Sequence, residues 1–294
     1  MIDPVKLQAD ALITEIRANY DRTYGRLNPD YPDIAAWATN MALEVIGNGD
    51  ALYHTVEHTV MVTLVGLDIV RGKHLRVGGV SPRNWLDFVV SLLCHDIGYV
   101  RGICVGDTRR RYATGRGDET VELGVGVTDA SMAPYHIDRG KLFVKARFGA
   151  TPVLDEHTIS LNLERTRFPV PQDGDHKATD DDPGLVRAAD LIGQLADPRY
   201  INKLPALFYE FEELGQNAKL GYASPDDLAR GYPRFFWEVV SPYITDGLRY
   251  LRATQRGRQW IANLYANFFM VEHDVVDHGG TVMSVGPSAL LPPD

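Results

Sequence analysis

The sequence predicts an all-α protein, because its apolar residues follow a helical period, helix-breaking residues divide it and strand patterns are missing. Apolar residues recur every three or four positions along most of the chain, beginning with the run from Leu7 to Tyr20. With 294 residues, 45% of them hydrophobic, the chain can bury a sizeable core. We therefore predict one helical domain over residues 1–275. An irregular tail over residues 276–294, with a Gly-Gly and a Pro-Pro pair, is predicted to follow it.

The predicted helices are separated by proline, glycine and polar stretches. Pro4 and Pro32 stand where the first turn of a helix tolerates proline. The helices are predicted at residues 4–20, 32–46, 52–70, 82–97, 133–148, 154–167 and 183–195. Two or three longer amphipathic helices, rich in aromatic residues, are predicted from there to about residue 272. Residues 98–120, rich in glycine and arginine, and the polar residues 171–184 are predicted to be loops.

The charge balance limits the kinds of partner. A net charge of −9 argues against nucleic acid as the main ligand and against an anionic membrane surface. A small phosphorylated substrate remains compatible, because a metal ion and a few arginines can supply local positive charge. The two cysteines exclude a disulfide framework. The sequence lacks a signal peptide pattern at its start and an apolar run of about 20 residues, so we expect a cytoplasmic protein.

Two pairs of residues suggest a metal site. His54 and His58 are four positions apart and would share one side of the predicted third helix. Both can bind a transition metal, or one can bind it while the other transfers a proton. His95 and Asp96 follow a nearly continuous apolar run, where a buried imidazole and carboxylate need a partner. Capping of the helix end is the alternative explanation for this second pair.

A third element of the same pattern is Asp190, which lies between apolar residues in a predicted helix. Carboxylates are rarely buried without a partner. An ion pair with Arg187 is one explanation, and a metal ion is the other. Together with His58, His95 and Asp96, this residue forms a mixed nitrogen and oxygen set that suits one or two divalent ions. The set does not distinguish Mn, Fe, Zn, Ni and Mg.

The order His, His-Asp and a distant Asp resembles the HD superfamily of metal-dependent phosphohydrolases. Residues 53–58, Tyr-His-Thr-Val-Glu-His, are similar to the first motif of the class I cyclic-nucleotide phosphodiesterases, with Thr55 in place of asparagine. Residues 93–98 and 188–191 are similar to their second and third motifs, and residues 128–131 with His136 to a further segment. The resemblance covers about residues 50–196 and implies an HD-domain, phosphodiesterase-like helical bundle.

The resemblance also implies roles for single residues. His58, His95, Asp96 and Asp190 would bind the first metal, and Asp96 would bridge to a second. A metal-activated hydroxide would attack phosphorus while His54 protonates the leaving oxygen. A carboxylate such as Glu57 or Glu44 is expected to support the charge of His54, and His136 is expected near the second metal or the phosphate. The glutamine that holds the purine ring in those phosphodiesterases has no counterpart beyond Tyr232, so cyclic-nucleotide specificity is not implied.

Several further residues have two explanations each. Arg109 and Arg111 can reach a substrate phosphate from the loop after His95-Asp96, or they form a solvated basic loop. His157 can be an extra ligand of a dinuclear site, or a surface histidine. The aromatic residues of the C-terminal helices are expected in the core or in a homodimer contact. Two other functions stay open: an HD-type di-iron oxygenase, with His136 and His157 as additional ligands, and a non-catalytic metal-binding regulatory domain.

Overall fold

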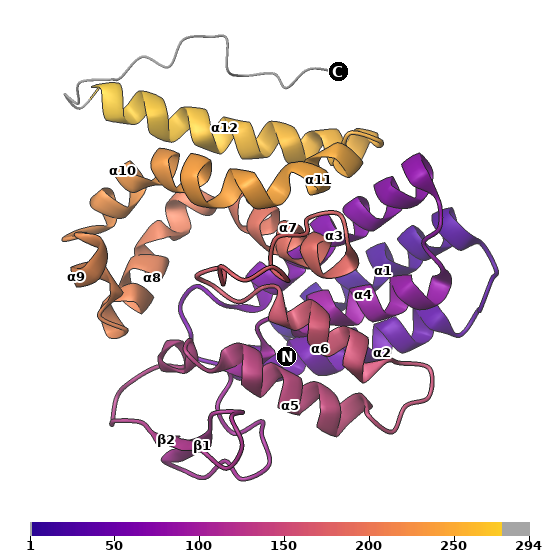
Figure 1. The fold of residues 1–294 in the computed structure, drawn as a ribbon, viewed down its shortest axis with the longest axis horizontal. Helices are drawn as coiled ribbons and strands as arrows, with labels where there is room; N and C mark the ends of the chain where they lie inside the picture. Colours follow the sequence, from indigo (N-terminus) through magenta and orange to yellow (C-terminus); the bar gives the residue numbers. More distant parts are fainter. Residues whose placement is uncertain (1, 278–294) are drawn as a thin grey trace.

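The computed structural model describes residues 2–277 and confirms the all-α prediction (Figure 1). The α-helices are α1 (Pro4–Tyr24), α2 (Tyr31–Gly47), α3 (Val56–Val77), α4 (Pro82–Cys94), α5 (His136–Phe148), α6 (Glu156–Glu164), α7 (Asp182–Leu195), α8 (Tyr200–Glu213), α9 (Gln216–Leu220), α10 (Pro225–Phe235), α11 (Ser241–Leu251) and α12 (Gln255–Asp277). Shorter elements are the 3-10 helices η1 (Ile97–Tyr99) and η2 (Asp129–Met132), the π-helix η3 (Phe236–Val240) and the strands β1 (Arg111–Ala113) and β2 (Thr120–Glu122). The predicted tail lies outside the described residues from residue 278 onward.

The sequence defines the start of the helices that carry the site. Ser81 and Asp181 precede α4 and α7, and the side chain of each accepts a hydrogen bond from a backbone N–H group in the first turn. Proline follows both caps within the first two helical positions. Such a cap contributes about 1 kcal/mol, and proline is preorganised for a helical first turn. These two helices therefore begin at fixed points, which places the residues further along them.

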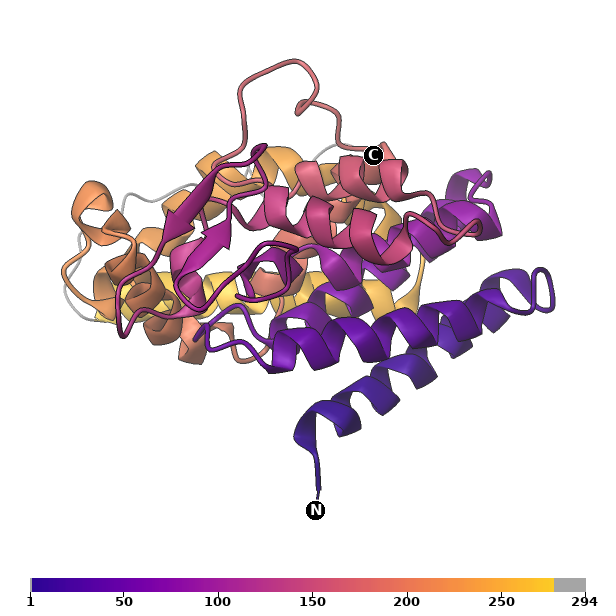
Figure 2. The same cartoon turned by 90° about the horizontal axis from the view of Figure 1, so that it is seen from below.

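α3 lies at the centre of the bundle, in contact with α7, α1, α11 and α4 (Figures 1 and 2). The approach of α3 to α7 is close: a Cβ atom at Gly193 would lie 2.7 Å from the Cα atom of Val62. One continuous cluster of buried apolar residues runs from Ala9 in α1 to Val271 in α12. The helices therefore share a single core in the described part of the chain.

Three predicted elements were wrong in detail. The third helix begins at Val56 and not at residue 52, because Thr55 adopts an extended backbone as its N-cap. The segment after α7 forms five α-helices and not two or three, because Gly215 and Gly221 have positive φ angles and interrupt it. The loop predicted at residues 98–120 contains η1 and most of an antiparallel hairpin, in which Arg111 lies opposite Glu122.

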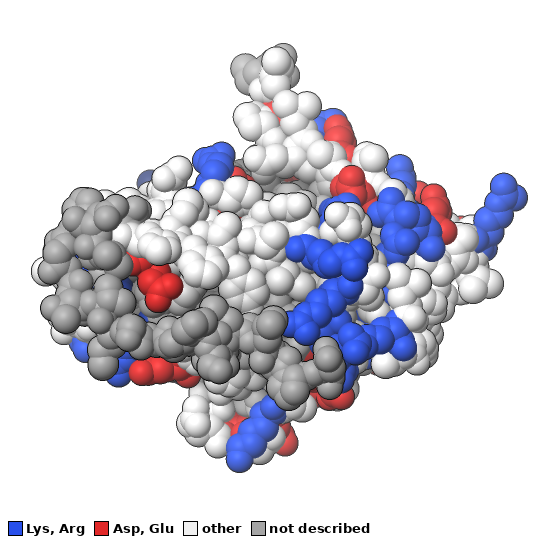
Figure 3. Space-filling model, turned by 90° about the horizontal axis from the view of Figure 1, so that it is seen from above, with Lys and Arg blue, Asp and Glu red and all other residues white. Residues whose placement is uncertain are grey.

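Basic side chains gather on one part of the face that α11 and α12 cover (Figure 3). Arg256 in α12 forms ion pairs with Glu15 in α1 and Asp68 in α3. Among residues 2–277, none of the helices is long and apolar enough to cross a membrane.

The hairpin segment is fixed to α5 by a buried ion pair. Arg139, whose side chain is fully buried, pairs with Asp107 at 3.1 Å between Nη2 and Oδ2. The same guanidinium donates hydrogen bonds to the carbonyl oxygens of Gly98, Val100 and Ala113. The chain that follows Asp96 is therefore held against α5 by one side chain.

Replacing Arg139 with methionine is expected to destabilise the protein by about 3–5 kcal/mol, because Asp107 is then buried without its partner. Urea unfolding followed by circular dichroism measures the loss. The double variant Arg139→Met with Asp107→Leu should lose less, since it leaves no unpaired charge. A single variant as stable as the wild type would contradict this role of the ion pair.

Candidate metal centre

Four side chains meet where α3, α4 and α7 come together. His58 lies in the first turn of α3, His95 and Asp96 directly follow α4, and Asp190 lies in α7. Nε2 of His58 is 3.2 Å from Nε2 of His95, 3.2 Å from Oδ2 of Asp96 and 3.4 Å from Oδ1 of Asp190. Nε2 of His95 is 3.0 Å from the same oxygen of Asp96. The structure thus brings together the four residues that were predicted from the sequence. The alternative ion pair between Arg187 and Asp190 is not formed, because Arg187 donates hydrogen bonds to the carbonyl oxygens of residues 176 and 178.

The donor set fits a cation. His95 donates from Nδ1 to the carbonyl oxygen of Leu92, which leaves Nε2 without a proton when the ring is neutral. Oδ2 of Asp96 is buried and accepts no hydrogen bond of good geometry within the described residues. A buried carboxylate oxygen without a hydrogen bond is costly. His58, His95 and Asp190 each offer one ligand atom, and these atoms lie within 4.8 Å of one another.

The electrostatics of the cluster follow from burial and opposite charge. Burial lowers the pKa of His95, but the neighbouring Asp96 outweighs this effect and raises the pKa to about 9. Burial in turn raises the pKa of Asp96, and the nearby imidazoles lower it well below its ordinary value. Asp96 is therefore ionised at neutral pH, and a cation bound here displaces protons from the imidazoles.

His54 lies beside this cluster but outside the helix in which it was predicted. It precedes α3, and its Nδ1 donates to Oε2 of Glu210 at 2.6 Å. The other oxygen of Glu210, a nearly fully buried residue of α8, accepts hydrogen bonds from the backbone N–H groups of Tyr53 and His54. Burial lowers the pKa of His54, but the charge of Glu210 and its hydrogen bond raise this pKa by more. The pKa of His54 therefore lies above its ordinary value.

The carboxylate that supports His54 is therefore Glu210, and the prediction of Glu57 or Glu44 was wrong. Glu57 is in the first turn of α3 and pairs instead with Lys203 at 3.1 Å. Glu44 is exposed on α2. With Nδ1 of His54 committed to Glu210, Nε2 is the nitrogen left to meet a ligand. The rings of His54 and His58 are 5.8 Å apart between centroids, so the His54 ring lies beside the cluster.

A column of three stacked rings forms one wall of the site. Tyr99 in η1 stacks on His54 at 4.3 Å and on His136 at 4.4 Å between ring centroids. His136 donates from Nδ1 to the carbonyl oxygen of Ala133, and its Nε2 lies 3.9 Å from Oδ1 of Asp96. Burial lowers the pKa of His136, which favours a neutral ring with a free Nε2. This position suits a contact to a second ion or to an anionic ligand.

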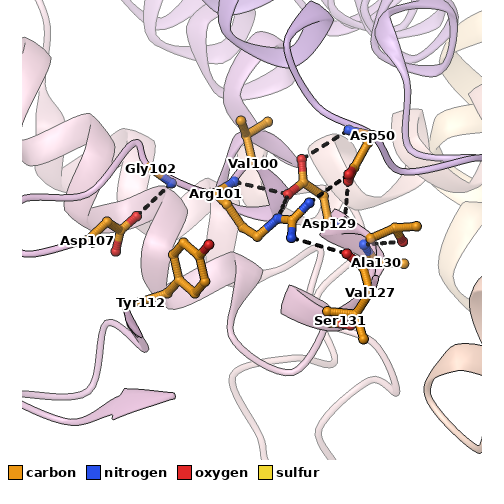
Figure 4. A network of polar contacts seen from close by, with 12 residues as sticks. Asp50, Val100, Arg101, Gly102, Asp107, Tyr112, Val127, Asp129, Ala130 and Ser131 are labelled. Carbon is orange, nitrogen blue, oxygen red and sulfur yellow. Dashed lines mark hydrogen bonds and ion pairs between the residues drawn. The ribbon is translucent and has the colours of Figure 1, made fainter. Parts of the chain in front are cut away.

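The segment before His136 is fixed from two sides. Glu213, one turn after Glu210 in α8, accepts hydrogen bonds from the backbone N–H and hydroxyl groups of Thr128 and from the hydroxyl group of Ser131. On the other side, the buried Asp129 pairs with Arg101, which also pairs with Asp50 (Figure 4). α8 therefore holds both His54, through Glu210, and the η2 segment, through Glu213.

Other residues predicted at the site lie elsewhere. His157 is exposed in the first turn of α6, where its backbone N–H group bonds to Asp155. Arg109 and Arg111 are exposed at the start of the hairpin. Tyr232 is buried and packs against Tyr200 and Phe268, and its hydroxyl group has no hydrogen bond partner within residues 2–277.

Glu210, Glu213 and Tyr99 were not predicted from the sequence as residues of the site. Only Tyr99 had a local signal, because it follows the His-Asp pair by three positions.

No curated protein and no solved structure matched the chain. One family model, described as Npun_R2479-like, matches residues 2–274 and so includes every residue of the candidate metal centre. The chain belongs to the Npun_R2479-like family.

Proposed function

We propose that this protein is a metal-dependent phosphohydrolase of the HD type that cleaves a phosphoester of a small molecule. The observation that carries the proposal is the pairing of two features in one site. Two imidazoles and two carboxylates converge on a point, and His54 lies next to them with its Nδ1 bound to a buried glutamate. Metal ligands alone suit many functions, whereas an adjacent histidine kept in its charged form suits protonation of a leaving group.

Each residue has a defined part in this hydrolysis. His58, His95, Asp96 and Asp190 would hold the ion, which when bound activates water and stabilises the negative charge of the phosphoryl group. Glu210 keeps a proton on His54, and Nε2 of that ring donates it to the departing oxygen. His136 has its Nε2 3.9 Å from Oδ1 of Asp96 and would contact the phosphoryl group or a second ion there.

The same observations weigh against the di-iron oxygenase. That function needs two further histidines near the cluster. His136 lies beside Asp96, but His157 is exposed in α6. The buried histidines near the cluster suit one tightly bound cation and a second cation that is bound more weakly beside it.

Hydrolysis by the purified protein tests the proposal. Protein loaded in turn with Mn²⁺, Mg²⁺, Ni²⁺, Fe²⁺ or Zn²⁺ is assayed with bis-p-nitrophenyl phosphate, p-nitrophenyl phosphate and cyclic and linear nucleotides. We expect turnover with at least one metal and none after chelation. Two bound irons with oxygen uptake would replace the proposal with the oxygenase, and metal binding without turnover of any phosphoester would favour a regulatory domain.

A further inference from the structure

A second feature lies on the hairpin, apart from the metal centre. The hairpin and the chain next to η1 border an open hollow of about 710 Å³. It is lined by residues 123–126 and by Arg101, Thr108, Arg109, Arg110 and Tyr112. None of the four proposed metal ligands lines it, nor does His54 or His136. The hollow is large enough for a small organic ligand, since such sites measure about 300–1,000 Å³.

The charge of the hollow is positive and largely uncompensated. Arg109 and Arg110 are exposed, and neither forms an ion pair within residues 2–277. Arg101 is different, because Asp50 and Asp129 hold its guanidinium, as Figure 4 shows. Arg101 therefore forms a fixed wall, and the other two arginines supply the free charge.

Residues 124–126, which also line the hollow, offer backbone donors. The N–H groups of Gly124, Val125 and Gly126 form no hydrogen bond with other described residues. Gly126 has a φ angle of +88°, a backbone conformation that residues other than glycine rarely adopt. Val125 is 85% exposed, so the segment that carries these donors is accessible to solvent. Unpaired backbone N–H groups in a hollow that is also lined by arginines are donors for an anion.

We propose that this hollow binds a small molecule that carries at least two phosphate groups. Each guanidinium can donate two parallel hydrogen bonds to one phosphate, so two adjacent arginines match two phosphates. Binding here needs no metal ion, because no carboxylate side chain lines the hollow. The site stands apart from the proposed hydrolysis and does not depend on it.

Arg111 gives a matched control for the test. It follows Arg110 directly, carries the same charge and is equally exposed, but it lies on β1 opposite Glu122 and does not line the hollow. All three arginines are on the surface, so alanine at any of them should leave the fold intact. If the loss of positive charge alone weakened binding, Arg111→Ala would weaken it as much as alanine at Arg109 or Arg110.

The experiment is calorimetric titration of metal-free protein with inorganic pyrophosphate. Arg109→Ala and Arg110→Ala together should raise the Kd by at least about tenfold, whereas Arg111→Ala should change it less than about twofold. Orthophosphate should bind the wild type at least about tenfold more weakly than pyrophosphate. Failure of the wild type to bind pyrophosphate, an equal loss in Arg111→Ala, or equal binding of orthophosphate would overturn the proposal.

One more variant tests whether pyrophosphate binds at the metal centre instead. Asp96→Ala should bind pyrophosphate as the wild type does, because Asp96 does not line the hollow. If this variant loses binding in the same buffer, the pyrophosphate occupies the metal centre and the proposed site is refuted. A protein without hydrolytic activity that still shows the predicted arginine dependence would disprove the proposed function and leave this site in place.

Discussion

Replacing Asp96 with alanine is expected to remove the bound metal and the hydrolysis of phosphoesters together. Oδ2 of Asp96 lies within 3.2 Å of ring nitrogens of both His58 and His95, and it has no other partner in the described residues. The loss in metal affinity should exceed about 100-fold, because changing even an outer partner of a metal ligand costs about 10–100-fold. Turnover should fall below detection, since without the ion nothing remains to activate water.

Metal content and initial rate are measured on the same sample. Elemental analysis after dialysis gives ions per chain, and the rate with bis-p-nitrophenyl phosphate gives the activity. Asp118→Ala, which changes an exposed carboxylate in the hairpin, is the control and should keep both. Asp96→Asn keeps the shape of the side chain and should still lose affinity, because the charge is lost. A variant that retains one ion per chain and full activity would exclude Asp96 as a ligand.

The cluster could be predicted because its members stand out locally. His95 and Asp96 follow an apolar run, and Asp190 lies among apolar residues, so each was expected to need a partner. The structure brings them together with His58, with short contacts between their ligand atoms. The all-α fold was predicted for a similar reason, since periodic apolar stripes are a property of the local sequence.

The support of His54 could not be predicted in this way. Glu210 is separated from His54 by 156 positions and stands in the sequence Glu-Phe-Glu-Glu, where acidic residues are ordinary on an amphipathic helix. Glu57, three positions from His54, was the natural candidate, but it pairs with Lys203 of α8. Only the packing of α8 shows which glutamate is buried against the histidine.

The helical pairing of His54 and His58 failed for a local reason. A spacing of four places two residues on one side only within a continuous helix. The chain bends before Val56, and Thr55 has an extended backbone at the helix start. The two rings still approach each other, because Tyr99 and Glu210 position His54 from other parts of the chain. The two residues are therefore close, as predicted, but not because they share one face of a helix.

Replacing His54 with asparagine is expected to lower kcat by about 100- to 10,000-fold without loss of metal, since general acid catalysis contributes about this much. His54 bonds to Glu210 and not to the cluster, so the ligands stay in place. The loss should depend on the leaving group. It should be large for an alkyl phosphodiester, whose alkoxide needs a proton, and small for a p-nitrophenyl ester, whose phenolate leaves without one. An equal loss with both substrates would show that His54 is not the acid.

Glu210→Gln should reveal the same proton through the pH dependence of kcat. Glu210 raises the pKa of His54 above its ordinary value, so the charged acid persists to higher pH and activity declines as pH rises through that pKa. Glutamine keeps a hydrogen bond but removes the charge, so the decline should begin at lower pH. Glu212→Gln, on the same helix and bound to Asn217, should leave the profile unchanged. An unshifted profile in Glu210→Gln would show that this carboxylate orients the ring without setting its charge, because a merely structural role lowers the rate equally at every pH.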